Sequence, residues 1–267
     1  MEIRNYLVPK SLDEAVTVLN QSPDNHVFAG GAWIKNTLKR IDTAIELSHL
    51  ISSNILEYPD HIEIGAMTTL HDLESSLLLN HYFDGIIAKA SQSIMGITVK
   101  NIATIGGTIA GKYSFSDLLT VLLALDVTLS FHKKGFVKLS SFLTTNYPQK
   151  DILISISIDK NIAFGYFHKV SRTSLDFAII NVAVTYQNNR YFIVVGARPG
   201  TAAFALKAMN YINELKQITE EDIEETCRIA SDELSFSSNF RGTKEYRKTL
   251  AYVYVKRGLK VVIGHVS

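Results

Sequence analysis

The sequence predicts an α+β protein in two consecutive parts, residues 1–160 and 161–267. Near the N-terminus, two short apolar runs flank a segment of helical character. In the C-terminal part, three strand-like runs come before three helical ones. Strands grouped before helices are typical of α+β layers, whereas closely alternating strands and helices favour small parallel units. The first part divides again at about residue 52.

The N-terminal 52 residues predict a small parallel unit. Capping-box spacing predicts a helix over residues 11–20. The apolar run 27–29 ends at a Gly-Gly pair, and a second apolar run follows at residues 44–47. A helix over residues 33–40 would connect the two strands and leave them parallel.

Residues 53–160 predict a second mixed unit. The segment 116–125 is apolar on nearly all sides, which indicates a buried helix. Isoleucine stands at every second position from residue 152 to residue 158, with Ser155 and Ser157 on the opposite face, which indicates a strand with one apolar face. The remaining predicted elements are a helix at 82–93 and strands at 62–64, 127–132 and 135–139.

The C-terminal part predicts a three-stranded antiparallel sheet covered by helices. Asn188 and Asn189 are suited to a two-residue hairpin turn between the last two strands. The predicted strands span 163–170, 177–187 and 190–197, and the predicted helices span 201–215, 220–233 and 243–262.

Composition excludes several classes of protein. The chain has 267 residues, of which 46% are hydrophobic and 20% charged, as in globular proteins. With 27 basic and 26 acidic residues, the net charge of +1 favours neither nucleic acid nor an anionic membrane. We see no signal peptide and no apolar run long enough to span a bilayer, so we expect a cytoplasmic protein.

Cys227 is the only cysteine. One thiol excludes an intramolecular disulfide and a self-contained iron–sulfur cluster, which usually needs four thiolates. The eight histidines are scattered, so we predict no metal site. We also assign no catalytic acid, base or nucleophile.

The most informative stretch is residues 101–111, which contains three glycines within six residues. Such a segment can bring backbone N–H groups close to a phosphate, and a helix is predicted to begin soon afterwards, near Ser116. A tight turn packed with small residues explains the same glycines. A P-loop is disfavoured, because Tyr113 follows Lys112 where a Ser or Thr would bind magnesium.

Gly30 and Gly31 form a second glycine turn between a predicted strand and a predicted helix. The G-x-G-x-x-G fingerprint of nicotinamide-binding Rossmann domains is absent from the sequence. Two glycine turns from different subdomains could clamp the two phosphates of a dinucleotide.

Three charged side chains are further candidates for ligand contacts. Asp117 could accept a hydrogen bond from a ligand hydroxyl, but with Ser114 it also has the spacing of a helix cap. Lys169 and Arg172 could face an anionic ligand or lie at a solvated strand end. Acidic residues in 220–225 and basic residues in 244–260 suggest either solvated helix faces or a docking surface for a partner.

Five segments occur in an order that resembles the FAD-binding subunit of molybdenum hydroxylases, the xanthine dehydrogenase and carbon monoxide dehydrogenase family. The resemblance covers nearly the whole chain and implies a PCMH-type FAD-binding domain of two α/β subdomains, with FAD between it and a C-terminal domain. The segments are AGGAWIKN (29–36), NIATIGGTIAG (101–111), SDLLTVLLALDVTL (116–129), DILISISI (151–158) and KVSRTSLDFAIINVAV (169–184).

The resemblance also implies which residues contact FAD. Two segments match the family's pyrophosphate loops, and Asp117 matches the acid that contacts the sugar-like chain of the flavin. Leu153 and Lys169, or its neighbour His168, match positions near the isoalloxazine ring. The loop residues are Ala29, Gly30, Gly31, Ala32 and Trp33 in the first loop, and Thr104, Ile105, Gly106, Gly107 and Thr108 in the second.

Departures from the family pattern bear on these contacts. The first loop usually reads Gly-Gly-Thr-Asp, but Ala32 and Trp33 stand here, so a hydroxyl and a carboxylate are missing while backbone contacts survive. The second loop ends in Thr108 instead of Asn. The usual Ala-Ser-Pro segment is replaced by residues 112–114.

The function implied by the resemblance is electron transfer within a complex. A molybdopterin-binding large subunit would hydroxylate the substrate, and a 2Fe-2S small subunit would pass electrons to FAD on this chain. NAD or another acceptor would then receive them. The alternatives are a stand-alone flavin oxidoreductase and a flavin-free assembly subunit.

Overall fold

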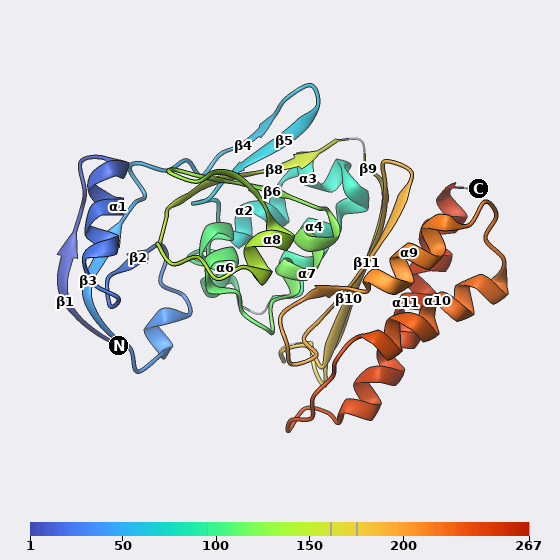
Figure 1. Ribbon diagram of the computed structural model, residues 1–267. Coiled ribbons are helices and arrows are strands. Elements are labelled where there is room, and N and C mark those ends of the chain that lie inside the picture. Colours follow the sequence, from blue (N-terminus) through green and yellow to red (C-terminus); the bar gives the residue numbers. More distant parts are fainter. Residues whose placement is uncertain (95, 161, 175, 267) are drawn as a thin grey trace. The chain divides into compact units, whose positions relative to one another are not determined.

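The computed structural model describes residues 1–94, 96–160, 162–174 and 176–266 (Figure 1). The chain forms two compact units, each built from separated stretches of sequence. Unit 1 comprises Met1–Asp72, Gly96–Gly111 and Thr128–Ile158, and unit 2 comprises Leu73–Met95, Lys112–Val127 and Asp159–Ser267. No helix in the described part of the chain is both long and apolar enough to cross a bilayer.

Unit 1 begins with a parallel sheet of strand order β1–β3–β2. The predicted parallel pairing of β2 with β3 is confirmed, and β1 is a strand that the sequence did not predict. Ser11 caps the following helix, because its hydroxyl accepts a hydrogen bond from the Glu14 amide. The elements are β1 (Glu2–Leu7), α1 (Leu12–Gln21), β2 (His26–Phe28) and β3 (Arg40–Glu46).

The helix predicted over residues 33–40 is wrong, because only the 3₁₀ turn η1 (Ile34–Asn36) forms there. The backbone of Thr37 is extended, and its hydroxyl donates to the Ile34 carbonyl at 2.7 Å, which closes the turn. Strand β3 then begins at Arg40, which pairs with Glu2. The extended backbone at Thr37 thus ends the helical turn, and the last residue of the predicted helix, Arg40, belongs to the sheet.

A five-stranded sheet forms the rest of unit 1, in the order β4–β5–β8–β6–β7. In the predicted strand 151–158, Ile156 and Ile158 are fully buried, but Ser155 on the other face is also only 6% exposed. The strands are β4 (Ile55–Glu57), β5 (His61–Gly65), β6 (Thr128–Phe131), β7 (Gly135–Lys138) and β8 (Leu153–Asp159), and the helices are α5 (Ile97–Lys100), α6 (Ile105–Gly111) and α8 (Leu139–Thr144), with α2 (Leu70–Ser75) at the unit boundary.

Unit 2 contains an antiparallel sheet of order β12–β11–β10–β9. The predicted Asn188–Asn189 turn is confirmed, since both residues have the positive φ that such a hairpin needs. The sheet has a fourth, two-residue strand where a helix was expected. The elements are β9 (Ile162–Val170), β10 (Ile180–Gln187), β11 (Arg190–Gly196), β12 (Ala203–Phe204), α9 (Leu206–Glu214), α10 (Glu220–Glu233) and α11 (Lys244–Val266).

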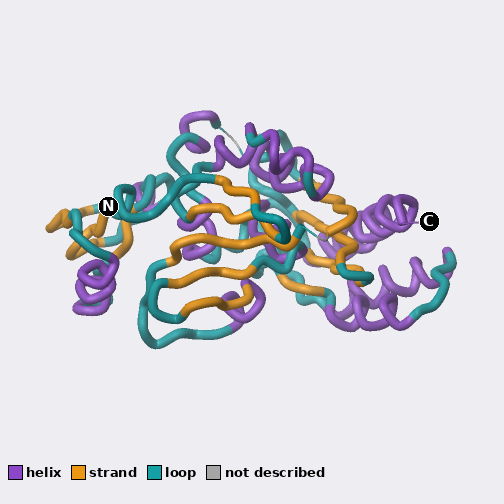
Figure 2. The backbone as a smooth tube through the Cα atoms, turned by 90° about the horizontal axis from the view of Figure 1, so that it is seen from above, coloured by secondary structure: helices purple, strands orange, loops and turns teal. Residues whose placement is uncertain are grey.

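Unit 2 also contains a group of shorter helices, coloured purple with the others in Figure 2. They are α3 (Leu77–His81), η2 (Phe83–Gly85), α4 (Ile86–Gln92) and α7 (Asp117–Ala124). The single helix predicted over residues 82–93 is therefore wrong in its first turn. Phe83, Asp84 and Gly85 have left-handed φ values of 60°, 52° and 66°, which interrupt an α-helix.

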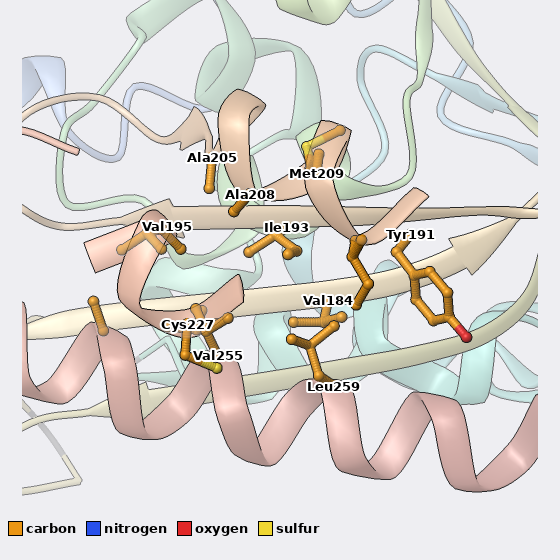
Figure 3. Close-up of a cluster of buried hydrophobic side chains, with 14 of the residues drawn as sticks. Val184, Tyr191, Ile193, Val195, Ala205, Ala208, Met209, Cys227, Val255 and Leu259 are labelled. Atoms are coloured by element: carbon orange, nitrogen blue, oxygen red, sulfur yellow. The ribbon is translucent and has the colours of Figure 1, made fainter. Parts of the chain in front are cut away.

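The two faces of β10 contact different layers. Val184 on one face packs with Val255 and Leu259 of α11 and with Cys227 of α10 in the core of unit 2 (Figure 3). Asn181 and Thr185, on the other face, are hydrogen-bonded to the buried helix α7. The sheet of unit 2 thus lies between α7 and the C-terminal helices.

Candidate flavin site

The first glycine segment follows β2 and packs closely against the second. A Cβ atom on Gly30 would lie only 1.4 Å from the carbonyl oxygen of Ile102. Only glycine therefore fits at residue 30. Two predicted phosphate-binding segments that are distant in sequence meet inside unit 1.

The first segment offers free backbone donors. Among the residues that the structure describes, none accepts a hydrogen bond from the N–H groups of Gly30, Gly31 and Ala32. Gly31 has a left-handed φ of +66°, and Gly30 is exposed. Successive unpaired N–H groups around a left-handed residue are suited to binding an anion.

The second segment differs from the expected loop, because Gly106 and Gly107 lie inside α6. The N–H of Ile105 donates to the Thr68 carbonyl at 2.9 Å, and that of Gly106 to the Ala66 carbonyl at 2.9 Å. The Gly107 N–H donates to Thr104 Oγ1 at 3.1 Å. These three N–H groups already have acceptors. The expectation that residues 101–111 form a glycine loop ahead of a helix is therefore wrong, because most of the segment is itself the helix α6.

A pyrophosphate fits the first segment through its backbone. Binding a phosphate through these three N–H groups would use neither the hydroxyl nor the carboxylate that the family pattern has at the positions of Ala32 and Trp33. Trp33, the only tryptophan of the chain, is 38% exposed beside them. In the second segment, the Thr108 hydroxyl donates to the Thr104 carbonyl at 3.0 Å, so both threonines help to build α6.

Leu153 lies in β8, opposite Phe131, and is 8% exposed. Backbone hydrogen bonds connect its strand to the second glycine segment. The carbonyl of Ile154 accepts from the Ala66 N–H at 2.8 Å, and the Ala66 carbonyl accepts from Gly106. Leu153 thus belongs to the same unit as both glycine segments.

Asp117 is the first residue of α7 and is only 4% exposed. The cap of this helix is Ser116, whose hydroxyl accepts from the Leu119 amide at 3.1 Å. The capping role considered for Ser114 is therefore wrong. The Asp117 carboxylate serves another purpose.

The Asp117 carboxylate lies at the centre of a buried polar network in unit 2. Its Oδ1 accepts from Asn181 Nδ2 at 2.6 Å, and its Oδ2 from Ser93 Oγ at 3.1 Å. Lys169 Nζ lies 3.2 Å from Oδ2 and donates to the Ser93 carbonyl at 2.8 Å. The structure thus brings together two residues, Asp117 and Lys169, that the sequence predicts for one site.

Strand alternation places Lys169 and His168 on opposite faces of β9. In β9, Lys169 pairs with Asn181 on the face toward α7. The His168 ring instead stacks on Tyr254 of α11, with centroids 4.2 Å apart, and burial lowers its pKa. Lys169 is the residue beside Asp117.

The network leaves hydrogen-bonding capacity for a ligand. An ionised carboxylate has about four acceptor positions, and the described residues fill only one position on Oδ1. Lys169 has three N–H donors, two of which reach partners within the described part of the chain. Burial raises the pKa of Asp117, while the Lys169 ammonium and the donors from Asn181 and Ser93 oppose that shift. The Asp117 carboxylate can therefore accept a further hydrogen bond, from a ligand hydroxyl.

Asn181, Thr120 and Ser93 complete this network but were missed from the sequence. Thr120 Oγ1 donates to Asn181 Oδ1 at 2.7 Å. A polar asparagine within the apolar run of β10 was the available signal. No sequence signal pointed to Ser93.

Other charged groups are paired within unit 2. Arg172 lies 2.8 Å from Asp176, which also contacts Arg241. Arg247 is buried, donating to the carbonyls of Ile179 and Ala197, so it is not on a solvated helix face.

The acidic and basic sets of the last two helices pair with each other. Lys260 of α11 lies 2.7 Å from Glu220 of α10, and Lys256 contacts Glu224 in the same way. Lys248 lies 2.6 Å from Asp232. Pairing within the chain explains these opposite charges without a docking partner.

Family models match almost the whole chain. Residues 1–159 match the FAD binding domain in molybdopterin dehydrogenase, and residues 165–262 match the CO dehydrogenase flavoprotein C-terminal domain. The chain belongs to the molybdenum hydroxylase FAD-binding family. It is thus an FAD-binding subunit of the kind found in carbon monoxide and xanthine dehydrogenases, which confirms the resemblance seen in its sequence.

Relatives of similar length support this assignment. The chain is 25% identical to the glyceraldehyde dehydrogenase medium chain of Sulfolobus acidocaldarius, over 97% of this chain and 98% of that one. It is 26% identical to the carbon monoxide dehydrogenase medium chain of Hydrogenophaga pseudoflava, over 95% of each.

Solved structures share the fold of this family member. A carbon monoxide dehydrogenase structure from Hydrogenophaga pseudoflava matches with a TM-score of 0.85, 24% identity, and coverage of 98% of this chain and 97% of that one. Quinoline 2-oxidoreductase from Pseudomonas putida 86 matches with a TM-score of 0.83 and 22% identity, over 98% of each chain. The predicted fold class, an FAD-binding domain followed by a C-terminal α+β domain, is confirmed.

Proposed function

We propose that this chain is the electron-transfer subunit of a molybdenum hydroxylase complex. It would work with a molybdopterin-binding large subunit and a 2Fe-2S small subunit, and deliver electrons to NAD or another acceptor. The observation that carries the proposal is the match to proteins named medium chains, which covers at least 95% of this chain and of each relative. In addition, the chain has a single cysteine, Cys227, which is buried. One thiol cannot supply the four ligands that an iron–sulfur cluster usually needs, so the electron donor would be a separate subunit.

Within that function, we assign the pyrophosphate of FAD to the free N–H groups of Gly30, Gly31 and Ala32. Ala29 and Trp33 flank these donors, and Ile102, just before the segment Thr104–Thr108, packs against Gly30. We propose that Thr104–Thr108 forms the second segment beside the pyrophosphate. When bound, FAD supplies the redox chemistry, and the protein supplies orientation and electrostatics. We propose that Asp117 accepts a hydrogen bond from a hydroxyl of the flavin chain, with Leu153 and Lys169 near the ring. Residues 1–160 would form the FAD-binding domain and 161–267 the C-terminal domain.

Flavin titration tests the cofactor assignment directly. Trp33 is the only tryptophan and lies beside the free donors, so we expect added FAD to quench its fluorescence. The loaded protein should be yellow, with flavin absorbance at about 450 nm. A folded, colourless chain whose fluorescence is unchanged by FAD would overturn the assignment.

Affinity purification of the tagged chain from its native host tests the complex. We expect recovery of a molybdopterin-containing protein and a small cysteine-rich iron–sulfur protein. Recovery of a yellow chain without either partner would instead support a stand-alone flavin oxidoreductase.

A further inference from the structure

Strand β10 holds helix α7 at both of its ends. At the C-terminal end, Thr185 Oγ1 and Gln187 Nε2 donate to the Ala124 carbonyl at 2.7 Å and 2.9 Å. At the N-terminal end, Asn181 Nδ2 donates to Asp117 Oδ1 at 2.6 Å. The two ends therefore differ in what they bind, a backbone carbonyl at one and an ionisable side chain at the other.

Asn181 has its amide held in one orientation. Its side chain is fully buried, and its Oδ1 accepts from the Thr120 hydroxyl at 2.7 Å. A reversed amide would place the carbonyl oxygen against the carboxylate of Asp117 and the NH₂ group against the hydroxyl. The Thr120 contact thus keeps the donor side toward Asp117.

Gly196 leaves the space in which this contact forms. It lies opposite Asn181 in the β10–β11 ladder. A Cβ atom there would lie 2.1 Å from Thr120 Oγ1 and 2.3 Å from Asn181 Oδ1. Neither atom can move away easily, because both are buried and hydrogen-bonded to each other.

We propose that Asn181 is a positioning residue for FAD, acting through Asp117. Its N–H group fixes the carboxylate so that the unfilled acceptor position of Oδ1 stays available to a ligand hydroxyl. Lys169 and Ser93 both act on Oδ2, so they leave Oδ1 without another donor from the described residues. The inference rests on the proposed role of Asp117 in FAD binding.

The test compares isosteric variants of the full chain by FAD titration and thermal unfolding. Asn181→Leu removes the donor to Asp117, and we expect about tenfold weaker FAD binding. Thr120→Val removes the contact that orients the amide, together with a longer hydrogen bond to the Ser116 carbonyl at 3.4 Å, and we expect about threefold weaker binding. Thr185→Val is the matched control, because it removes a buried β10–α7 hydrogen bond that does not reach Asp117.

A double-variant cycle separates positioning from general destabilisation. If Asn181 acts through Asp117, Asn181→Leu should weaken FAD binding far less in an Asp117→Asn background. Equal FAD affinity for Asn181→Leu and Thr185→Val, at similar melting temperatures, would overturn the proposal. If Asn181→Leu fails to fold, equal affinity for Thr120→Val and Thr185→Val has the same meaning. Failure of the unaltered chain to bind FAD would instead overturn the proposed cofactor site itself.

Discussion

The two glycine segments of unit 1 resemble each other in sequence and differ in the use of their backbone donors. The N–H groups of Gly30, Gly31 and Ala32 have no acceptor among the described residues. Those of Ile105, Gly106 and Gly107 are all hydrogen-bonded, to Thr68, Ala66 and Thr104.

This difference shows that glycines alone do not make a phosphate site. In the first segment, glycine permits a left-handed turn and a close backbone contact, and the donors stay free. In the second, glycine permits α6 to pack tightly against residues 66–68. The first segment is therefore the better anion site of the two.

Gly30→Ala should produce the largest effect. Its Cβ would overlap the Ile102 carbonyl oxygen, so the two segments must separate. We expect a loss of roughly 1–3 kcal/mol in the free energy of unfolding and at least about tenfold weaker FAD binding.

Gly264→Ala is the control for this prediction, because a Cβ on Gly264 in α11 would meet nothing within 4 Å. Denaturant unfolding and FAD titration provide the measurements. Gly30→Ala behaving like Gly264→Ala would contradict the close contact.

The second largest effect should be a difference in amide hydrogen exchange between the two segments. Without FAD, the amides of Gly30–Ala32 should exchange quickly, and those of Ile105–Gly107 slowly. Adding FAD should slow exchange mainly in the first segment. Equal protection of the two segments in the free protein would contradict the difference in hydrogen bonding between them.

Thr104→Val should have a moderate effect on stability. It keeps the shape of the side chain but removes the oxygen that accepts from the Gly107 N–H. We expect a loss of about 1 kcal/mol in the free energy of unfolding, as for other helix caps. Thr104→Ser retains the acceptor and should be close to the unaltered chain. If both variants are equally unstable, the hydroxyl is not the cause.

Gly107→Ala should have the smallest effect. Alanine favours a helix by up to about 1 kcal/mol over glycine, but its Cβ would lie 3.2 Å from Thr104 Oγ1. We expect these terms to cancel within about 0.5 kcal/mol. Gly106→Ala, whose Cβ would lie 2.7 Å from the Ala66 carbonyl oxygen, should be clearly less stable in the same unfolding experiment. The opposite order would show that α6 packs differently.

Elements with strong local signals could be predicted, and those set by pairing could not. Helix α10 matches its predicted bounds because Thr219 and Asp222 form a capping box at its start. The segment after Trp33 favours a helix locally, yet only one turn forms, because the backbone is extended at Thr37 and joins the sheet at Arg40. Burial of a residue such as Cys227, whose pKa rises to about 12, also depends on the packing around it.

By itself, the sequence determined the α+β class, the family and the positions of the two glycine segments, because periodicity and turn residues are local properties and the order of motifs is read directly along the chain. Only the tertiary structure decided that Gly30 contacts Ile102, that the N–H groups of Ile105 and Gly106 donate to the carbonyls of residues 68 and 66, and that Asn181 holds Asp117. These contacts join residues far apart in the chain. They depend on strand register and on which face each side chain takes, and spacing along the sequence specifies neither.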